Sequence, residues 1–231
     1  MMGKLLVLEG LDGSGKQTQT SYLCTAFQTA QAQYRHVSFP DYAQPSSALV
    51  KMYLQGEFGA SPQDVNPYAA SSFYAVDRFA SYRKFWKKDY DNGMVILADR
   101  YTTSNLVYQL PKLPRGEWNA FTEWLLDYEY HRFELPIPDL TIFLDMPPAV
   151  SESLLAKRYH GDEQKKDIHE KSMTFQQDCR QAALYAAQKL HWKVVSCAAG
   201  GSLRTPQEIH AEVLQIVREN GLLNQAETAK V

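Results

Sequence analysis

The stretch Leu5–Lys16, which reads LLVLEGLDGSGK, joins a short apolar run to a glycine-rich turn that ends in lysine. The apolar run Leu5–Glu9 is continuous rather than alternating, which predicts a strand buried on both faces of a sheet. A helix is predicted directly after the turn, from Gly15 to about Gln33. Glycines at this spacing let successive backbone N–H groups curl around an anion, and the positive end of the helix faces the same point. The stretch therefore predicts a phosphate-binding loop in an α/β fold.

The predicted loop carries the residue types that bind a nucleoside triphosphate. Lys16 can reach the β- and γ-phosphates as a point charge. Gln17, followed by Thr18, stands where a Ser or Thr hydroxyl ordinarily binds Mg²⁺, and the reach of a Gln amide oxygen differs from that of a hydroxyl. We expect the triphosphate to be bound by Gly10, Leu11, Asp12, Gly13, Ser14, Gly15, Lys16, Gln17 and Thr18.

Further apolar runs follow the first at intervals that leave room for helices. The predicted strands are Leu5–Glu9, His36–Phe39, Met94–Asp99, Leu140–Met146 and Trp192–Cys197. Later helices are predicted at Glu117–Glu134, at Lys171–Leu190 and after Thr205, the N-cap residue of the last helix. Strands that alternate with helices predict a three-layer α/β/α sandwich, in which helices cover both faces of a mostly parallel five-stranded sheet.

The composition indicates one globular domain. The chain has 231 residues, of which 45% are hydrophobic and 22% charged, and no linker rich in Pro or Gly divides it. We expect a single domain over residues 1–219 and a flexible polar tail over residues 220–231. The net charge of −2 does not favour nucleic acid as a partner.

The sequence also bears on the compartment. The first apolar run ends at Glu9 and is too short for a membrane span or the core of a signal peptide, so no membrane partner is expected. Cys24, Cys179 and Cys197 are widely spaced and form no metal-binding pattern. We interpret them as free thiols in a reducing, cytoplasmic compartment.

The predicted strand Met94–Asp99 ends in an acid, Asp99, and Arg100 follows it directly. The carboxyl end of that strand is expected to lie beside the phosphate loop. There the acid can hold Mg²⁺ and its water, and the Arg can bridge a donor and an acceptor phosphate. A surface ion pair is the alternative interpretation. The sequence lacks the NKxD motif of GTPases, so we favour phosphoryl transfer between two anions.

Residues 99–109, DRYTTSNLVYQ, resemble the DRYxxSxxAYQ signature of thymidylate kinases, with Val107 in place of Ala. Other segments resemble that family in the same order: FPDY at Phe39–Tyr42, FYAVDR at Phe73–Arg78, LPIPD at Leu135–Asp139 and a charged lid at about residues 157–170. The resemblance spans about residues 3–205. It implies an enzyme that uses ATP and Mg²⁺ to phosphorylate dTMP to dTDP and that forms a homodimer. The aromatic stripe Trp118–Tyr128 could serve that dimer or the core.

The resemblance assigns residues to the acceptor nucleotide. Tyr74 takes the place of the aromatic that stacks on thymine, and Arg78 that of the Arg that donates to thymine O4; core packing and a surface charge are the respective alternatives. Cytosine carries an amino donor at that position, which would repel the guanidinium. The residues implied to bind dTMP are Phe39, Tyr42, Tyr74, Arg78, Arg100, Asn105 and Tyr108.

The resemblance also implies the catalytic and metal-binding residues. The interior of the loop has no basic residue, so the lid is expected to supply a cation, and Arg158 is favoured over Lys165 and Lys166 because its fork can span two oxygens. The implied catalytic residues are Lys16, Arg100, Asp12 and Arg158, and the implied metal ligands are Asp12, Asp99 and Glu170. His160 and His169 are interpreted as surface residues without a role.

Two other functions stay open at this point. A deoxynucleoside kinase or another nucleoside monophosphate kinase would share the loop and the lid and would differ in the acceptor pocket. A nucleotide-binding protein that has lost catalysis is the second, and the unusual Gln17 and Asp41 favour it.

Overall fold

The computed structural model describes residues 2–147, 150–151, 168–169, 172–199 and 202–223. Arg158, His160, Lys165, Lys166 and Glu170, on which the lid predictions fall, lie outside these ranges, as do residues 224–231 of the expected tail. None of the helices in the described part is long and apolar enough to cross a membrane.

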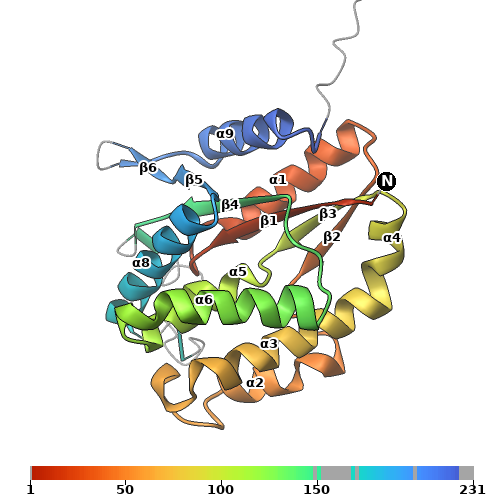
Figure 1. Ribbon diagram of the computed structural model, residues 1–231. Coiled ribbons are helices and arrows are strands. Elements are labelled where there is room, and N and C mark those ends of the chain that lie inside the picture. Colours follow the sequence, from red (N-terminus) through yellow and green to blue (C-terminus); the bar gives the residue numbers. More distant parts are fainter. Residues whose placement is uncertain (1, 148–149, 152–167, 170–171, 200–201, 224–231) are drawn as a thin grey trace, which may run out of the picture.

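The centre of the molecule is a sheet of five parallel strands, which confirms the predicted α/β fold (Figure 1). The strands are β1 Lys4–Gly10, β2 Tyr34–Ser38, β3 Val95–Asp99, β4 Leu140–Asp145 and β5 Lys193–Ser196. Their order is β2-β3-β1-β4-β5, with β1 hydrogen-bonded to both β3 and β4. The central strand β1 is buried on both faces, as its continuous apolar run predicts.

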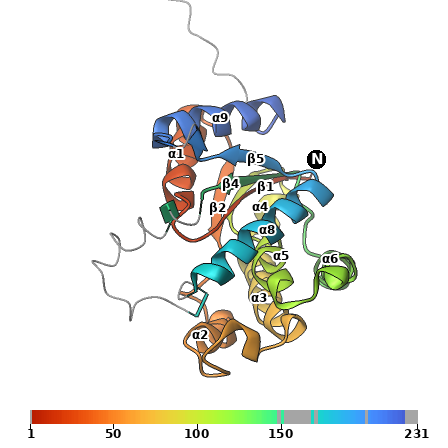
Figure 2. The same cartoon turned by 90° about the vertical axis from the view of Figure 1, so that its left-hand side faces the viewer.

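One face of the sheet is covered by α1 Lys16–Thr29 and α9 Pro206–Glu219, which lie side by side in Figures 1 and 2. Leu6 and Leu8 of β1 point to this face and join one hydrophobic cluster with residues of both helices. The predicted N-cap of α9 is confirmed, because the Thr205 side chain accepts from the backbone N–H of Glu208 in a capping box. Leu222 and Leu223 are buried in the same cluster, so the packed chain extends past residue 219.

A larger set of helices lies on the other side of the sheet (Figure 2). They are α2 Ala48–Leu54, α3 Pro67–Ser81, α4 Lys87–Asp91, α5 Thr103–Gln109, α6 Trp118–Leu126 and α8 Met173–Lys189. Short 3-10 turns occur at Pro45–Ser47, Pro62–Asp64, Leu110–Lys112 and Arg115–Glu117, and π-helical turns at Tyr82–Trp86 and Asp127–Arg132. Leu5 and Val7 of β1 point to this side.

Several bounds differ from the predicted ones. The predicted helix Glu117–Glu134 is α6 followed by the π-helical turn Asp127–Arg132. The aromatic stripe of α6 divides accordingly: Trp118, Phe121 and Leu125 are buried in the core, whereas Trp124 and Tyr128 are half-buried. The sequence patterns above also do not delimit α2 and α4, or the small antiparallel hairpin of β6 Ala198–Ala199 and β7 Ser202–Leu203.

Candidate active site

The phosphate loop connects β1 to α1 and requires its glycines. Gly13 and Gly15 have φ angles of 74° and 84°, in the left-handed region that favours glycine. A Cβ on Gly10 would lie 2.5 Å from Ser14 Oγ and 3.2 Å from the backbone oxygen of Leu144. The tight backbone path therefore follows from the glycine spacing of the sequence.

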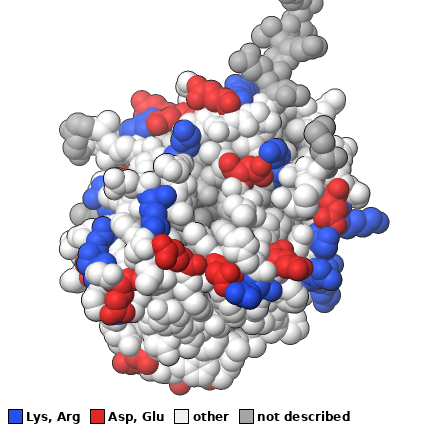
Figure 3. Space-filling model, in the orientation of Figure 1, with Lys and Arg blue, Asp and Glu red and all other residues white. Residues whose placement is uncertain are grey.

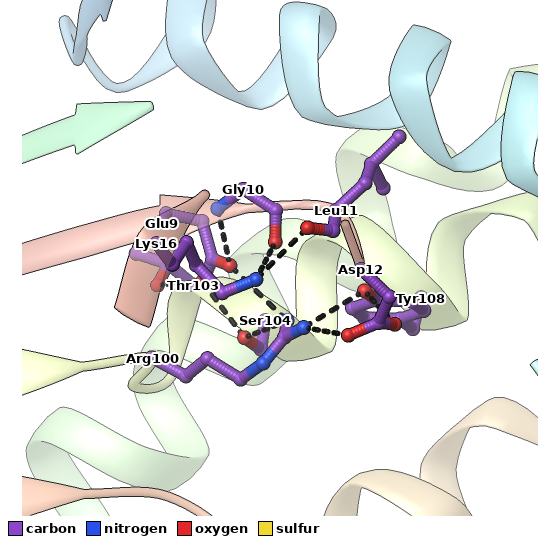
Figure 4. A network of polar contacts seen from close by, with 9 residues as sticks. All are labelled: Glu9, Gly10, Leu11, Asp12, Lys16, Arg100, Thr103, Ser104 and Tyr108. Atoms are coloured by element: carbon purple, nitrogen blue, oxygen red, sulfur yellow. Dashed lines mark hydrogen bonds and ion pairs between the residues drawn. The ribbon is translucent and has the colours of Figure 1, made fainter. Parts of the chain in front are cut away.

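Lys16 lies across this loop (Figure 4). Its Nζ donates to the backbone oxygens of Gly10 and Leu11, at 2.8 and 2.9 Å. Burial and the nearby Arg100 charge lower the Lys16 pKa to about 8, although Asp12 acts in the opposite direction. The amine is therefore mainly charged at neutral pH and lies where the loop would receive a phosphate.

Arg100 reaches the loop from the carboxyl end of β3, as its position in the sequence predicts (Figure 4). Its Nη2 lies 2.5 Å from Asp12 Oδ1, and the Tyr108 hydroxyl donates to Asp12 Oδ2 at 2.8 Å. Burial alone would raise the Asp12 pKa, but Arg100, Lys16 and the Tyr108 hydrogen bond hold it at about 2. Asp12 is thus an anion that orients the guanidinium between loop and pocket.

Glu9 completes this network and is a residue that the sequence reading did not single out. Its carboxylate is fully buried, and Oε1 accepts from the Gly10 N–H at 2.9 Å. Oε2 accepts from the hydroxyls of Thr103 and Ser104, each at 2.7 Å. An acidic residue at the end of an apolar strand, directly before the loop, is the signal that could have identified it.

All seven residues predicted to bind dTMP line one pocket beside the loop, which we call the acceptor pocket. It is lined by Asp12, Phe39, Pro40, Tyr42, Leu54, Tyr74, Arg78, Arg100, Tyr101, Ser104, Asn105, Tyr108, Gln109 and His169. These side chains come from six separate segments of the chain, which the fold brings together at the carboxyl ends of β1, β2 and β3. Asp77, which is buried on α3, holds the segment after β2 by accepting from the Asp41 N–H at 2.8 Å.

Arg78 is not a surface charge. Its side chain is buried, and its Nε and Nη2 donate to the two carboxylate oxygens of Glu129 at 2.6 and 2.5 Å. Tyr74 is half-buried, lines the pocket and also packs against a hydrophobic cluster that includes Tyr53. The surface-charge alternative is therefore wrong for Arg78, whereas Tyr74 both packs on the core and lines the pocket.

Gln109 is a second pocket residue that the sequence reading did not assign. Its side chain is fully buried, and within the described ranges neither Nε2 nor Oε1 has a hydrogen-bond partner. A buried amide without partners is destabilising unless a ligand or water satisfies it. Gln109 also lines the wall of the acceptor pocket.

The interpretation of His169 as a surface residue is wrong. Its ring is buried, lines the acceptor pocket and stacks on Tyr108, with ring centroids 5.0 Å apart and planes 13° apart. Lys112 donates to the Tyr53 hydroxyl at 2.7 Å, and that hydroxyl lies 2.9 Å from His169 Nε2. Burial and the Lys112 charge lower the His169 pKa to about 3, so the ring is neutral at physiological pH. The sequence motif gave no signal for this contact because Tyr53 and His169 are far apart in the chain.

Of the three predicted metal ligands, Asp12 lies within the phosphate loop and Asp99 is the last residue of β3. Among the residues that the structure describes, no group of three or more His, Cys, Asp or Glu side chains could hold a metal. The carboxylate oxygens of Asp12 and Asp99 are of the kind that Mg²⁺ takes, one or two at a time, together with water and substrate phosphates.

Comparison with known proteins agrees with this geometry. The sequence model described as thymidylate kinase matches residues 8–208. The chain is 32% identical to the thymidylate kinase of Mycobacterium tuberculosis over 190 residues, which cover 79% of this chain and 84% of that protein. It is 25% identical to the probable thymidylate kinase of Pyrobaculum aerophilum over 213 residues, 92% of this chain and 95% of that protein.

A solved thymidylate kinase from Candida albicans shares the fold, with a TM-score of 0.70 at 24% identity, over 97% of this chain and 96% of that one. The family match covers most of the chain and includes the phosphate loop, β3 with Arg100, and the helices that line the acceptor pocket. The chain belongs to the thymidylate kinase family.

Proposed function

We propose that this chain phosphorylates dTMP to dTDP with ATP, and that it binds dTMP in the acceptor pocket and ATP on the phosphate loop. The observation that carries the assignment of sites is the position of Arg100. Its guanidinium lines the pocket and contacts Asp12 of the loop, so one cation is shared by the two nucleotide sites. A charge in that place suits an acceptor that already carries a phosphate.

In the proposed reaction an oxygen of the dTMP phosphate attacks the γ-phosphorus of ATP. The bond from that phosphorus to the bridging oxygen breaks, and its electron pair leaves with ADP. Arg100 holds the acceptor phosphate, and Lys16 exchanges its carbonyl partners for oxygens of ATP. Both charges stabilise the negative charge that develops on the transferred group. Asp12 keeps Arg100 aimed at the reaction centre.

We further propose that Mg²⁺ is held by the carboxylates of Asp12, Asp99 and Glu170 together with phosphate oxygens. Bound there, the ion would neutralise charge on the phosphates. Arg158 is proposed as the cation that the lid adds. Thr18, Gln17 and the backbone of the loop are proposed to complete the ATP site.

Base recognition is proposed to depend on Tyr74, Arg78 and Asn105, with Phe39, Tyr42 and Tyr108 enclosing the base and deoxyribose. The support is their common placement in one pocket wall. The Tyr108 hydroxyl donates to Asp12, and this contact supports the proposal that its ring lies beside the deoxyribose and disfavours a 2′-hydroxyl.

A homodimer is proposed from the aromatic surface of α3 and α6. Tyr68, Val76 and Phe79 of α3 are each 40% or more exposed. Tyr68 contacts Trp124 of α6 with ring centroids 4.6 Å apart, and Trp124 stacks on Tyr128. Figure 3 shows few charged side chains over the lower part of the molecule, where α2 and α3 lie. Exposed aromatic and aliphatic side chains on a face with few charges are typical of subunit contacts. The three free cysteines favour a cytoplasmic site of action.

The proposed function is tested by coupled ADP release with ATP, Mg²⁺ and a panel of acceptors: dTMP, dUMP, UMP, dCMP and thymidine. We expect dTMP to be the best acceptor and thymidine to be poor. Faster turnover of thymidine or of dCMP would favour a different nucleotide kinase. Tight nucleotide binding without ADP release would favour a protein that has lost catalysis.

A further inference from the structure

Glu129 is a fully buried carboxylate to which the proposed mechanism gives no role. It lies on the π-helical turn Asp127–Arg132, and turns of this kind occur often at functional sites. Its Oε2 accepts from Arg78 Nε at 2.6 Å and from the Thr102 hydroxyl at 2.8 Å. Its Oε1 accepts from Arg78 Nη2 at 2.5 Å and from Asn105 Nδ2 at 2.9 Å. One carboxylate therefore contacts both polar residues that are proposed to face the base.

These contacts fix the orientation of the Asn105 amide. Nδ2 donates to Glu129 and also to the backbone oxygen of Ser71, at 3.3 Å. Both partners are acceptors only, so the amide nitrogen must occupy this side and Oδ1 the other. Asn105 lines the acceptor pocket, and the atom that it can offer to a ligand is therefore the acceptor Oδ1.

Glu129 also fixes the orientation of the Arg78 guanidinium, which offers a donor to the pocket where Asn105 offers an acceptor. A bidentate pair with Glu129 uses one edge of the guanidinium, Nε and Nη2. Among the described residues Nη1 has no hydrogen-bond partner, and Arg78 lines the same pocket wall as Asn105. The pocket therefore receives a donor from Arg78 and an acceptor from Asn105.

This donor and acceptor pair distinguishes the pyrimidine bases. Thymine presents an acceptor at O4 and a donor at N3–H, whereas cytosine presents an amino donor at position 4 and an acceptor at N3. We propose that Glu129 sets the base specificity of the acceptor pocket, because it holds Arg78 as a donor and Asn105 as an acceptor. Glu129 touches no substrate in this scheme and is a positioning residue. The inference rests on the proposed function, in which the pocket binds dTMP.

Glu129→Gln tests the proposal because it keeps the shape of the side chain and replaces one acceptor oxygen by an NH₂ donor. Whichever oxygen the NH₂ group replaces, it faces one N–H group of Arg78, and at the Oε1 position it also faces Asn105, whose amide then turns to present Nδ2 to the pocket. The kcat/KM ratio of dTMP to dCMP is expected to fall about tenfold or more, which is the worth of one hydrogen bond to a charged group. The change should lie mainly in KM for dTMP, with kcat at saturation within about threefold.

The matched control is Asp139→Asn, also a carboxylate-to-amide change. Asp139 accepts from the Leu5 N–H and from Lys4 at the amino ends of β1 and β4, opposite to the pocket, so this variant should lose stability and keep the nucleotide ratio. If Glu129→Gln does not fold, Thr102→Val decides the question. This substitution removes one hydrogen-bond donor to Glu129 and leaves Arg78 and Asn105 unchanged. We expect the kcat/KM ratio of dTMP to dCMP to fall about threefold.

An unchanged dTMP to dCMP ratio in the folded variants, with equal losses for both nucleotides, would overturn the proposal and leave Glu129 a purely structural residue. The wild-type protein in the same panel separates this result from a failure of the proposed function. A wild type that does not prefer dTMP to dCMP would overturn the proposed function, and the role of Glu129 with it.

Discussion

Glu9 and Arg100 meet across the carboxyl ends of the neighbouring strands β1 and β3, where Arg100 Nη1 lies 3.4 Å from Glu9 Oε1. Arg100 has a φ angle of 65°, unusual for a residue with a side chain, and its N–H donates to the backbone oxygen of Leu8. The surrounding contacts must hold that conformation. Glu9 also accepts from the Gly10 N–H, so a single carboxylate fixes both the start of the phosphate loop and the guanidinium (Figure 4).

The first prediction concerns Glu9→Gln. The new NH₂ group would face groups that now donate to Glu9, either the Gly10 N–H or the hydroxyls of Thr103 and Ser104. Arg100 would also lose the negative charge of the buried carboxylate beside it. We expect the free energy of unfolding to fall by about 2–4 kcal/mol. We expect kcat to fall about 10- to 100-fold with smaller changes in KM, because the displaced charges act in the transition state. Denaturant unfolding and steady-state kinetics measure the two effects. A folded variant with wild-type kcat would show that Glu9 does not position Arg100.

The second prediction concerns the pH dependence of stability. The folded-state pKa of His169 is lowered to about 3, first by burial and then by Lys112, from an ordinary value of 6.5. The unfolded chain therefore binds a proton that the folded chain does not, between pH 6.5 and 3. The contribution of the neutral, buried His169 ring to the free energy of unfolding is complete above pH 6.5 and is lost as the pH falls toward 3.

Between pH 6.5 and 4 this residue should lower the free energy of unfolding by about 3 kcal/mol. His169→Gln should remove that part of the slope, because Gln does not titrate. Denaturant unfolding at several pH values is the measurement, with the exposed His131→Gln as the control that keeps the wild-type slope. Parallel slopes for wild type and His169→Gln would contradict a neutral buried ring.

The third prediction tests the proposed dimer surface. Val76 lies on α3, between Tyr74 and Arg78 in the sequence, and its side chain is 44% exposed. Val194 on β5 is 42% exposed and serves as the control. A new carboxylate in an apolar interface would be left without a partner, so Val76→Glu should yield monomers. Val194→Glu should keep the oligomeric state of the wild type. Sedimentation equilibrium measures both, and a Val76→Glu protein with unchanged mass would exclude this face.

The sequence predicted those parts of the fold and site that depend on local patterns. The five parallel strands, the glycine-rich loop and the cap at Thr205 are each encoded in a few adjacent residues. The contacts that were missed join distant segments. Glu129 meets Arg78 and Asn105 only because a π-helical turn directs it inward, and His169 meets Tyr53 across the pocket. No local periodicity distinguishes such residues from solvent-exposed charges, since their partners are determined by tertiary packing.

The last prediction concerns Gln109, whose buried amide has no partner in the described part of the chain. A protein selected only for stability would place an apolar side chain here, because an unsatisfied buried amide costs about 1–3 kcal/mol. Gln109→Met keeps the length of the side chain and removes the amide. We expect the free energy of unfolding to rise by about 1 kcal/mol and KM for dTMP to rise about tenfold.

Gln176→Met is the matched control. Gln176 is also buried, but its Nε2 donates to the backbone oxygen of His169 at 2.8 Å, so the same substitution removes a hydrogen bond that exists in the folded protein. It should lower the free energy of unfolding by about 1 kcal/mol. Opposite signs for the two variants, measured by denaturant unfolding without nucleotide, would show that Gln109 is kept for its ligand. If Gln109→Met destabilises the protein as Gln176→Met does and leaves KM unchanged, the amide serves the fold and not the acceptor nucleotide.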